Sequence, residues 1–490
     1  MNKPTNYNFI FKSTFLFGSV KVFLILSKIG LSKAVSILLG PTGVGLMGLY
    51  ESTIQLIATF SGLGISQSTI RDISEVNETK NETKISRIIS LTNGLVLYSA
   101  LFGFIITILF SSLFSFLTFG DTTKKFSFIF LSFAIFFTIM NQGRLAVLKG
   151  SRKLNSVALS LTTGSIFSFL IGFICYYTLG FNGIVPALIS IPLILFIISN
   201  YYVGKIKFKK IKLSLSDYFS DGFPILKMGL SLMYVSLSIV ISEYVIKTYI
   251  LNNSTIEMVG FFHAGTTLIM GYFGLITNAM ATDYYPRVSA INRDNIKLSH
   301  EVNRQSRVAL ILLGPLVVLF LFLMPFLVEL VYSKQFLPTT DYLGYAIFGV
   351  IFISCSNLMH LILLAKQKPS IFLFTVTFNR FVLIATSLYL FNYFSLKGLG
   401  VSFLIFSIFE FILLQIVLTY FYNIKINFET IKILSITLLL SLFSFLSLQI
   451  ESLILHLIVG LILFTLSGIY SLNIMRNMMD IDLLKIIKKK

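Results

Sequence analysis

Residues 88–118 read IISLTNGLVLYSALFGFIITILFSSLFSFLT and contain no charged side chain. A helix that crosses the hydrocarbon core of a bilayer needs about 20 consecutive apolar residues, so this stretch is long enough to do so. The stretch therefore predicts a transmembrane helix, and it is one of many along the chain.

Fourteen such apolar segments are spread over the 490 residues. They should be helical, because lipid cannot satisfy backbone N–H and C=O groups and a helix satisfies them internally. The alternating segments of a membrane β-barrel are absent. The sequence thus predicts an all-α integral membrane protein with about 14 transmembrane helices. The segments lie near residues 14–39, 44–70, 88–118, 126–148, 155–179, 182–203, 224–250, 256–283, 306–332, 340–364, 370–394, 398–423, 430–449 and 452–474.

The overall composition excludes a water-soluble enzyme. Hydrophobic residues make up 56% of the chain and charged residues 12%, whereas soluble domains are about 25% charged. Cys175 and Cys355 lie inside apolar runs, so neither a disulfide framework nor a metal site is indicated. No HExxH, GxSxG or CxxC motif is present. We therefore expect no enzymatic activity, no cofactor and no metal, and the N-terminus shows no cleaved signal peptide.

The basic residues predict the orientation in the membrane. The formal net charge is +19, which in a soluble protein would suggest nucleic acid but here reflects the positive-inside rule. If the N-terminus is cytoplasmic, the inside segments carry 30 Lys and Arg, whereas the outside loops carry Lys124, Lys125, Lys334 and Lys397. This bias predicts that both termini are cytoplasmic, and no nucleic-acid partner is expected.

A weak internal repeat predicts two similar lobes. Lys149 and Lys366 each begin the inside connection after the fourth helix of their half, at an offset of 217 residues, and Gly183 and Gly400 are separated by the same offset. Six spans map onto six in the same orientation, as in transporters that bind substrate between parallel repeats. The predicted domains are an N-terminal lobe (1–203), a basic linker (204–223), a C-terminal lobe (224–423), and two extra helices with a basic tail (424–490).

The linker alternates Lys with apolar residues in GKIKFKKIKLSLSDYFSDGF (204–223). Such a pattern suits an amphipathic segment lying on anionic lipid. A basic stretch with no role beyond setting the orientation explains the same pattern equally well.

Three basic residues lie at membrane depth and are candidates for a substrate site. An ionisable residue at the bilayer centre costs about 2.5–3.5 kcal/mol on insertion scales, so it usually faces a cavity or a partner. Lys21 and Lys28 are seven residues apart and share one helix face, and two ammonium groups would attract a diphosphate. Arg380 lies about ten residues into the eleventh span and suits phosphate oxygens. The alternatives are snorkelling lysines and an Arg380–Glu410 pair.

Other ionisable residues within spans are candidates for coupling or for charge balance. Glu51 could carry a coupling proton or sodium ion, or neutralise a lysine of the first span. Glu243 and Lys247 are four residues apart in the order that favours a helical ion pair. Secondary candidates are His263 and His360, which could protonate near neutral pH, although a membrane histidine is more often a hydrogen-bonded packing residue.

Two stretches near the start of the chain, LLGPTGVGLMGLY (38–50) and FSGLGISQSTIRDIS (60–74), resemble the opening of the O-antigen and polysaccharide flippases. These belong to the multidrug/oligosaccharidyl-lipid/polysaccharide exporter superfamily, as do the lipid II flippases. Later stretches resemble the same family: LAVLKGSRKLN (145–155), NGIVPALI (182–189) and VGFFHAGTTLIMGYFGLITNAMATDYYPRVS (259–289). Coverage extends over residues 10–425.

The resemblance implies two six-helix bundles around a cationic, alternating-access cavity. It implies a substrate, undecaprenyl-diphosphate-linked oligosaccharide, that moves from the cytoplasmic to the outer leaflet for O-antigen or lipopolysaccharide biosynthesis. It also implies possible partners, a polysaccharide polymerase and chain-length machinery. Fourteen spans are more usual in the lipid II group, where the last two helices form a groove for the lipid tail.

Two other functions fit the sequence less well. A multidrug cation exporter of the same fold would want acidic residues in its cavity. A membrane polysaccharide polymerase or glycosyltransferase would need a sizeable external loop or an acidic motif, and the outer loops here are short. Because no ATP-binding motif is present, the energy for a flippase would come from an ion gradient, from the membrane potential or from consumption of the substrate.

Overall fold

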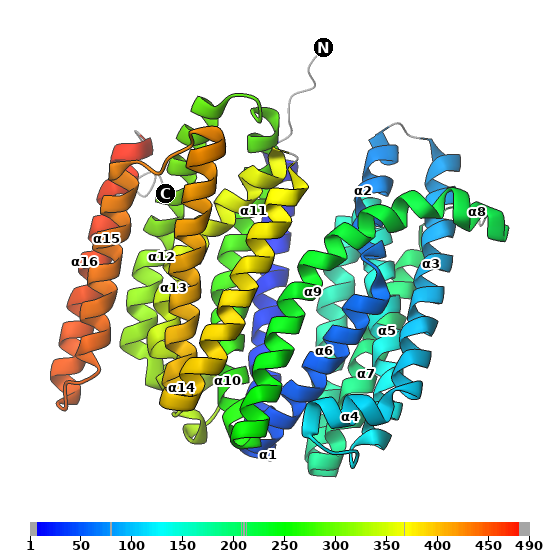
Figure 1. Cartoon of the computed structure of the whole chain (residues 1–490), viewed down its shortest axis with the longest axis horizontal. Helices are drawn as coiled ribbons and strands as arrows, with labels where there is room; N and C mark the ends of the chain where they lie inside the picture. The colour runs from blue at the N-terminus through cyan, green and yellow to red at the C-terminus, as the bar shows by residue number, and fades with distance from the viewer. Residues whose placement is uncertain are drawn as a thin grey trace. The chain divides into compact units, whose positions relative to one another are not determined.

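The computed structural model is helical along the chain (Figure 1) and describes residues 7–78, 81–206, 208, 211, 213–366 and 368–479. Within these residues ten stretches are long and apolar enough to cross a membrane. Two of them, Leu154–Gly204 and Pro369–Tyr422, are 51 and 54 residues long, about twice the length that one span needs. The expectation of an all-α membrane protein is confirmed, and about fourteen crossings fit these lengths.

Two kinks divide very long helices into pairs of spans. In α1 (Tyr7–Gly62) the kink is at Gly40, whose φ of 62° lies in the left-handed region that glycine adopts without steric cost. Pro41 follows directly and cannot donate a backbone hydrogen bond, so the chain turns there. In α14 (Pro369–Tyr422) the kink is at Ser395, with φ 52°.

Contacts between residues divide the chain into two compact units, Met1–Gly260 with Val331–Ser333, and Phe261–Leu330 with Lys334–Lys490. This division lies after α9 (Gly222–Asn253), because α9 packs against α1 and α2 (Ile65–Glu78). The lobe boundaries expected from the repeat therefore stay a prediction.

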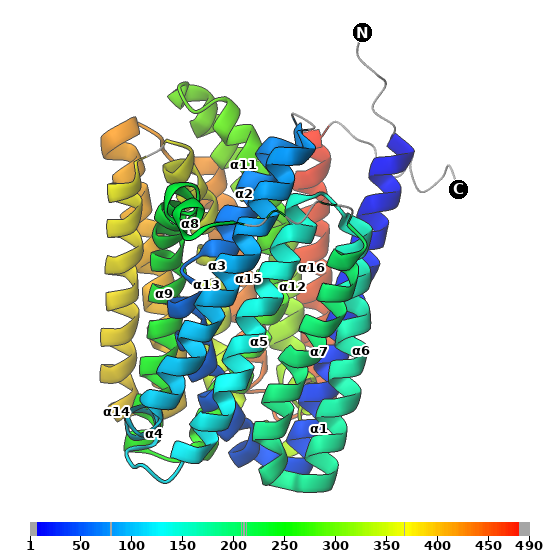
Figure 2. The ribbon, with the colours of Figure 1, turned by 90° about the vertical axis from the view of Figure 1, so that its right-hand side faces the viewer.

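The first unit, called unit 1 below, is built from long neighbouring helices. Figure 2 shows α3, α5, α6 and α7 side by side. A cluster of buried aliphatic side chains joins α2, α3, α5, α6 and α7, and it consists of Ile73, Ile89, Val147, Leu148, Val157 and Val203. The remaining helices of this unit are α3 (Glu82–Leu109), α4 (Ser111–Phe119), α5 (Lys125–Gly150), α6 (Leu154–Leu179), η1 (Gly180–Gly183), α7 (Ile184–Gly204) and α8 (Leu215–Ser220).

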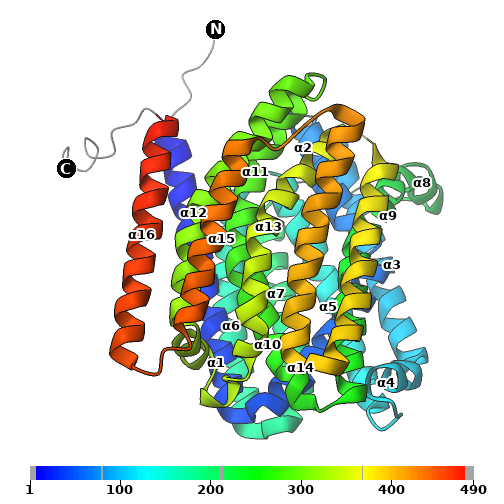
Figure 3. The same cartoon turned by 60° about the vertical axis from the view of Figure 1, so that its left-hand side comes forward.

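The second unit, called unit 2, has its core between α11, α12, α13 and α14. Tyr284, Leu298, Met359 and Leu414 belong to this core and are at most 3% exposed. Figure 3 shows α13 beside α14, and α15 beside α16. The helices of this part of the chain are α10 (Ile256–Leu268), η2 (Ile269–Phe273), α11 (Gly274–Ala290), α12 (Asn295–Val331), η3 (Lys334–Phe336), α13 (Thr339–Ala365), α15 (Phe428–Ser447) and α16 (Leu453–Met479).

Two glycine pairs let helices of unit 1 touch backbone to backbone. A Cβ on Gly45 would lie 2.0 Å from the carbonyl oxygen of Ile256, and one on Gly260 would lie 2.1 Å from that of Pro41. The second pair brings Gly64 equally close to Gly229 of α9. Because backbone atoms cannot move aside as side-chain ends can, these positions require glycine.

We predict that Gly45→Ala destabilises the protein by about 1–3 kcal/mol, because the added methyl group overpacks a backbone contact. The measurement is thermal unfolding of detergent-solubilised protein. The matched control is Gly468→Ala in α16, where an added Cβ meets no atom within 4 Å. Equal midpoints for the two variants would contradict the prediction.

Candidate functional site

The second half of α1 carries a polar stripe inside an apolar body. Glu51, Gln55 and Thr59 follow one another at four-residue spacing, so they share one face of the helix. Gln55 is exposed and Glu51 half-buried, and Glu51 acts electrostatically on the hydroxyl group of Tyr176. Polar side chains in a membrane helix usually face a cavity or the protein interior, so this stripe makes the second half of α1 a candidate part of the site.

The stripe ends at Thr59, which lines a pocket of about 340 Å³ in unit 1 with both polar and apolar side chains. The ends of α1 and α5 contribute to it together with α2 and α9, and Lys149 supplies the charged side chain of the lining. The side chain of Lys149 is exposed and has no hydrogen-bond or ion-pair partner among the described residues. The polar lining residues are Thr59, Ser66, Gln67, Gln142, Lys149 and Ser236.

An ammonium group surrounded by hydroxyl and amide groups can bind an anion and hydroxyl-rich groups together. The sequence identified Lys149 only as a landmark of the repeat, and it did not identify Gln67 or Gln142 as lining residues. Both glutamines lie within otherwise apolar segments of the sequence, and this pattern could have identified them as candidate lining residues.

Lys21 and Lys28 lie within the helical backbone of α1, but their side chains lie outside the described residues. The diphosphate site expected there stays a prediction.

Lys247 on α9 is 1% exposed, the most deeply buried of the described lysines. Its ammonium group donates to the Glu243 carboxylate at 2.6 Å and to the backbone carbonyl of Gly48 at 3.3 Å. The four-residue spacing thus produces an ion pair, and that pair also joins α9 to α1. Glu243 is 45% exposed, so one side of the pair is accessible.

In unit 2 the structure brings His360, Arg380 and Glu410 together. Nε2 of His360 lies 3.0 Å from Oε1 of Glu410, and both side chains are largely buried. The Arg380 guanidinium lies 5.0 Å from the centre of the Phe406 ring, and Glu410 acts on it electrostatically. The sequence analysis treated His360 as a lone histidine and gave Glu410 as an alternative partner for Arg380, whereas the hydrogen bond in the structure joins Glu410 to His360.

His263, the other secondary candidate, lies half-buried on α10, where its backbone carbonyl accepts a hydrogen bond from Thr266. It belongs to neither the pocket lining nor the His360 cluster.

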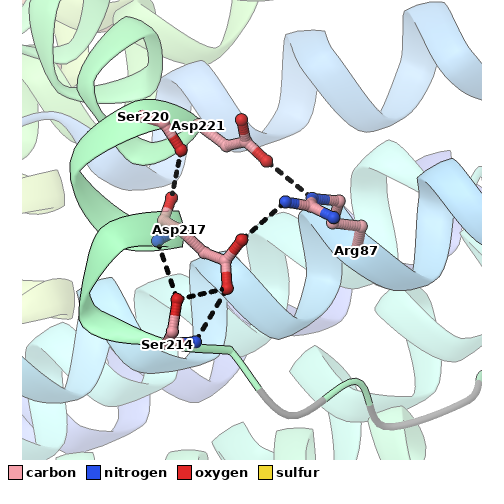
Figure 4. A network of polar contacts seen from close by, with 5 residues as sticks. All are labelled: Arg87, Ser214, Asp217, Ser220 and Asp221. Carbon is pink, nitrogen blue, oxygen red and sulfur yellow. Dashed lines mark hydrogen bonds and ion pairs between the residues drawn. The ribbon is translucent and has the colours of Figure 1, made fainter.

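An ion-pair network, which the sequence did not predict, joins α8 and Asp221, within the predicted linker, to α3 (Figure 4). The Arg87 guanidinium bonds Asp217 at 2.7 Å and Asp221 at 2.6 Å. Ser214 caps α8 through a reciprocal pair of hydrogen bonds with Asp217. Backbone and side-chain hydrogen bonds from Ser214, together with Arg87, hold the pKa of Asp217 below its usual range.

Because its pKa is lowered, Asp217 stabilises α8 in its ionised form. This contribution is fully present above the ordinary Asp pKa of about 3.9, and it is lost as the pH falls through the lowered pKa.

We predict that Arg87→Gln speeds hydrogen exchange in residues 215–220 at neutral pH, measured by mass spectrometry. Lys84→Gln, one turn earlier on α3, is the control and should leave this exchange unchanged. Equal exchange in both variants would show that Arg87 does not hold the linker.

The sequence is similar to those of known proteins. Residues 11–292 match the model of the family described as polysaccharide biosynthesis protein. The chain belongs to this family. It is 20% identical over 323 residues to the lipid III flippases of Escherichia coli (strain K12) and Shigella flexneri, a match that covers 65% of this chain and 76% of each relative.

Solved structures support the fold of this polysaccharide biosynthesis family member. The lipid II flippase MurJ in an inward closed conformation matches with a TM-score of 0.71 and 14% identity, over 95% of this chain and all of MurJ. An inward-facing multidrug resistance transporter of the MATE family matches with a TM-score of 0.62 and 15% identity, over 82% of this chain and 95% of the transporter. At these identities the likeness concerns the fold.

Proposed function

We propose that this protein is a flippase that moves an undecaprenyl-diphosphate-linked oligosaccharide, an O-antigen or similar surface polysaccharide unit, from the cytoplasmic to the outer leaflet of the bacterial inner membrane. The proposal places both termini in the cytoplasm and makes the protein a transporter rather than an enzyme. The observation that carries it is the pocket, lined by Lys149 and five other polar residues, within an apolar helical body. Family membership and the lipid III flippase relatives support the same substrate class.

The physical need for such a pocket follows from desolvation. A sugar diphosphate cannot enter hydrocarbon unaided, because its charges and hydroxyl groups would lose their water. The amide and hydroxyl groups of the pocket replace that water for the sugar, while the polyprenyl tail stays in lipid. Alternating access then exposes the head group to the other leaflet. Helices α15 and α16 extend beyond the repeated spans and are the proposed groove for the tail.

Cationic side chains would bind the diphosphate. We assign this role to Lys149 of the pocket, to Lys21 and Lys28 of α1, and to Arg380 of unit 2. The membrane potential supplies about 2.3 kcal/mol per charge per 100 mV, so an anionic head group that leaves a negative cytoplasm is helped outward. An ion gradient is a second energy source, with Glu51 and the Glu243–Lys247 pair as its proposed carriers or charge balance. A polysaccharide polymerase and chain-length machinery are the proposed partners downstream.

The multidrug exporter remains the competing function, because the MATE transporter shares the fold. An exporter of cations would require acidic groups where the substrate binds. The charged lining residue of the described pocket is Lys149, which favours an anionic substrate.

The test is to locate lipid-linked oligosaccharide in cells that lack the gene, in a strain with no second flippase. We expect it to accumulate on the cytoplasmic leaflet and to return to the outer leaflet when the wild-type gene is restored. Normal placement in the deletion strain would reject the flippase and favour drug export.

Complementation with variants then tests the assigned lysines. Lys149→Ala and Lys28→Ala should each lower the rate of flipping roughly tenfold or more, because a hydrogen bond to a charged group contributes about 1.5–3 kcal/mol. The control at equal protein level is Lys397→Ala, an exposed lysine outside the assigned sites. Full rescue by a lysine variant would remove that residue from the proposed site and leave the flippase standing.

A further inference from the structure

A second pocket, of about 490 Å³, lies in unit 2 at the end of the helices that the positive-inside rule predicts to be cytoplasmic. It is lined by the first turns of α12, by the last residue of α14 and by the connection from α14 to α15. Nine of its ten described lining residues are polar and none of the ten is acidic. The described linings of this pocket and of the pocket around Lys149 share no residue.

Hydrogen bonds hold the connection between α14 and α15 against α12. The side-chain amide of Asn303 donates to the backbone carbonyl of Lys425 at 2.8 Å, and its oxygen accepts from the backbone N–H of Asn427 at 2.8 Å. Asn303 is 3% exposed, so these bonds are shielded from water. The hydroxyl group of Ser299 donates to the same carbonyl of Lys425 at 3.3 Å. The backbone of Lys425 is therefore fixed at the pocket before any ligand binds, which lowers the entropic cost of binding.

Lys425 brings a positive charge to the pocket. Its side chain is exposed, and its ammonium group has no hydrogen-bond or ion-pair partner among the described residues. Arg307, the other cation of the lining, uses Nη1 to bind the exposed carboxylate of Glu429 at 2.6 Å. Its Nη2 keeps its N–H groups without a partner in the described part of the chain. An ammonium group and a guanidinium edge beside side-chain amides suit the oxygens of a phosphate.

Exposed apolar side chains beside the pocket favour a lipid over a soluble anion. Tyr420, in the last turn of α14, is 82% exposed, and Phe428, the first residue of α15, is 79% exposed. Ile296, which belongs to the pocket lining, is 84% exposed. A ligand with a charged head and a hydrocarbon tail can use both kinds of surface, whereas inorganic phosphate can use only the polar one. Basic pockets between membrane helices on the cytoplasmic side bind anionic headgroups in this way.

We propose that this pocket binds the phosphate-bearing headgroup of an anionic membrane phospholipid. Lys425 and Arg307 bind the phosphate oxygens, and the acyl chains lie along the apolar side chains beside the pocket. The phospholipid is a resident ligand of unit 2 and not the transported substrate, so the proposal does not depend on the flippase function. Because it binds the folded chain, it also stabilises unit 2.

The test is native mass spectrometry of the detergent-solubilised full chain titrated with phosphatidylglycerol or with phosphatidylcholine of the same acyl chains. The two lipids then differ in net charge, so the comparison isolates the headgroup. We expect phosphatidylglycerol to bind more tightly, by about fivefold for each basic side chain that contacts it. Equal binding of the two lipids would overturn the proposal.

Lys425→Gln locates the bound lipid. The substitution removes the charge and leaves the backbone bonds of residue 425 in place, so the fold is retained. Binding of phosphatidylglycerol should weaken about fivefold, and binding of phosphatidylcholine should not change. The matched control is Lys153→Gln, an exposed lysine on the predicted cytoplasmic side of unit 1 and outside both pocket linings. Undiminished binding in Lys425→Gln, or an equal loss in the control, would overturn the proposal.

Glu429→Gln tests Arg307 without removing it. The guanidinium is then free of its carboxylate partner, so phosphatidylglycerol should bind severalfold more tightly than to the wild type. Unchanged or weaker binding would contradict the part assigned to Arg307.

Competition with excess inorganic phosphate separates a lipid from a soluble anion. We expect bound phosphatidylglycerol to be retained, because phosphate gains nothing from the apolar side chains. Its displacement would identify a site for soluble anions and overturn the proposed occupant.

Discussion

The absence of hydrogen-bonding partners in lipid is the constraint on which this structure depends. Each polar group within the bilayer must be satisfied by the protein. Small hydroxyl side chains meet this demand locally by donating to their own helix, as Thr107 does to Gly103 and Ser407 to Phe403. Such side chains therefore cost little free energy in the apolar helices, whereas a charged side chain needs a partner from another turn or another helix.

The described charges at membrane depth follow this rule in two ways. Lys247 is buried and engaged twice, by Glu243 and by the Gly48 carbonyl, so it holds α9 to α1. Glu410 is buried with two basic neighbours, His360 and Arg380, so three ionisable groups share one cluster.

How much the sequence predicts depends on the range of the interaction. Apolar runs are contiguous, so the membrane helices could be predicted directly, and the Glu243–Lys247 pair followed from a spacing of one helical turn. The His360–Glu410 bond joins residues 50 apart, and the pocket around Lys149 is made by four helices. Neither leaves a local pattern, because helix packing decides which faces meet. The close contacts of Gly45 and Gly229 likewise could not be predicted from the sequence, because they depend on how the backbones pack.

The predicted repeat illustrates why residues that correspond in sequence need not make the same contacts. Lys149 and Lys366 correspond to one another in the repeat that the sequence predicts, 217 residues apart. In unit 2 the Lys366 ammonium donates to the Asn292 carbonyl and, at 2.5 Å, to Oδ1 of Asn295. In unit 1 Lys149 faces a pocket without such a partner among the described residues. A lysine already held by two acceptors gains little from a phosphate, because it must first give them up, whereas Lys149 gives up only water. Residues that correspond in the predicted repeat thus differ in their local acceptors, and this difference favours Lys149 over Lys366 as an anion-binding residue.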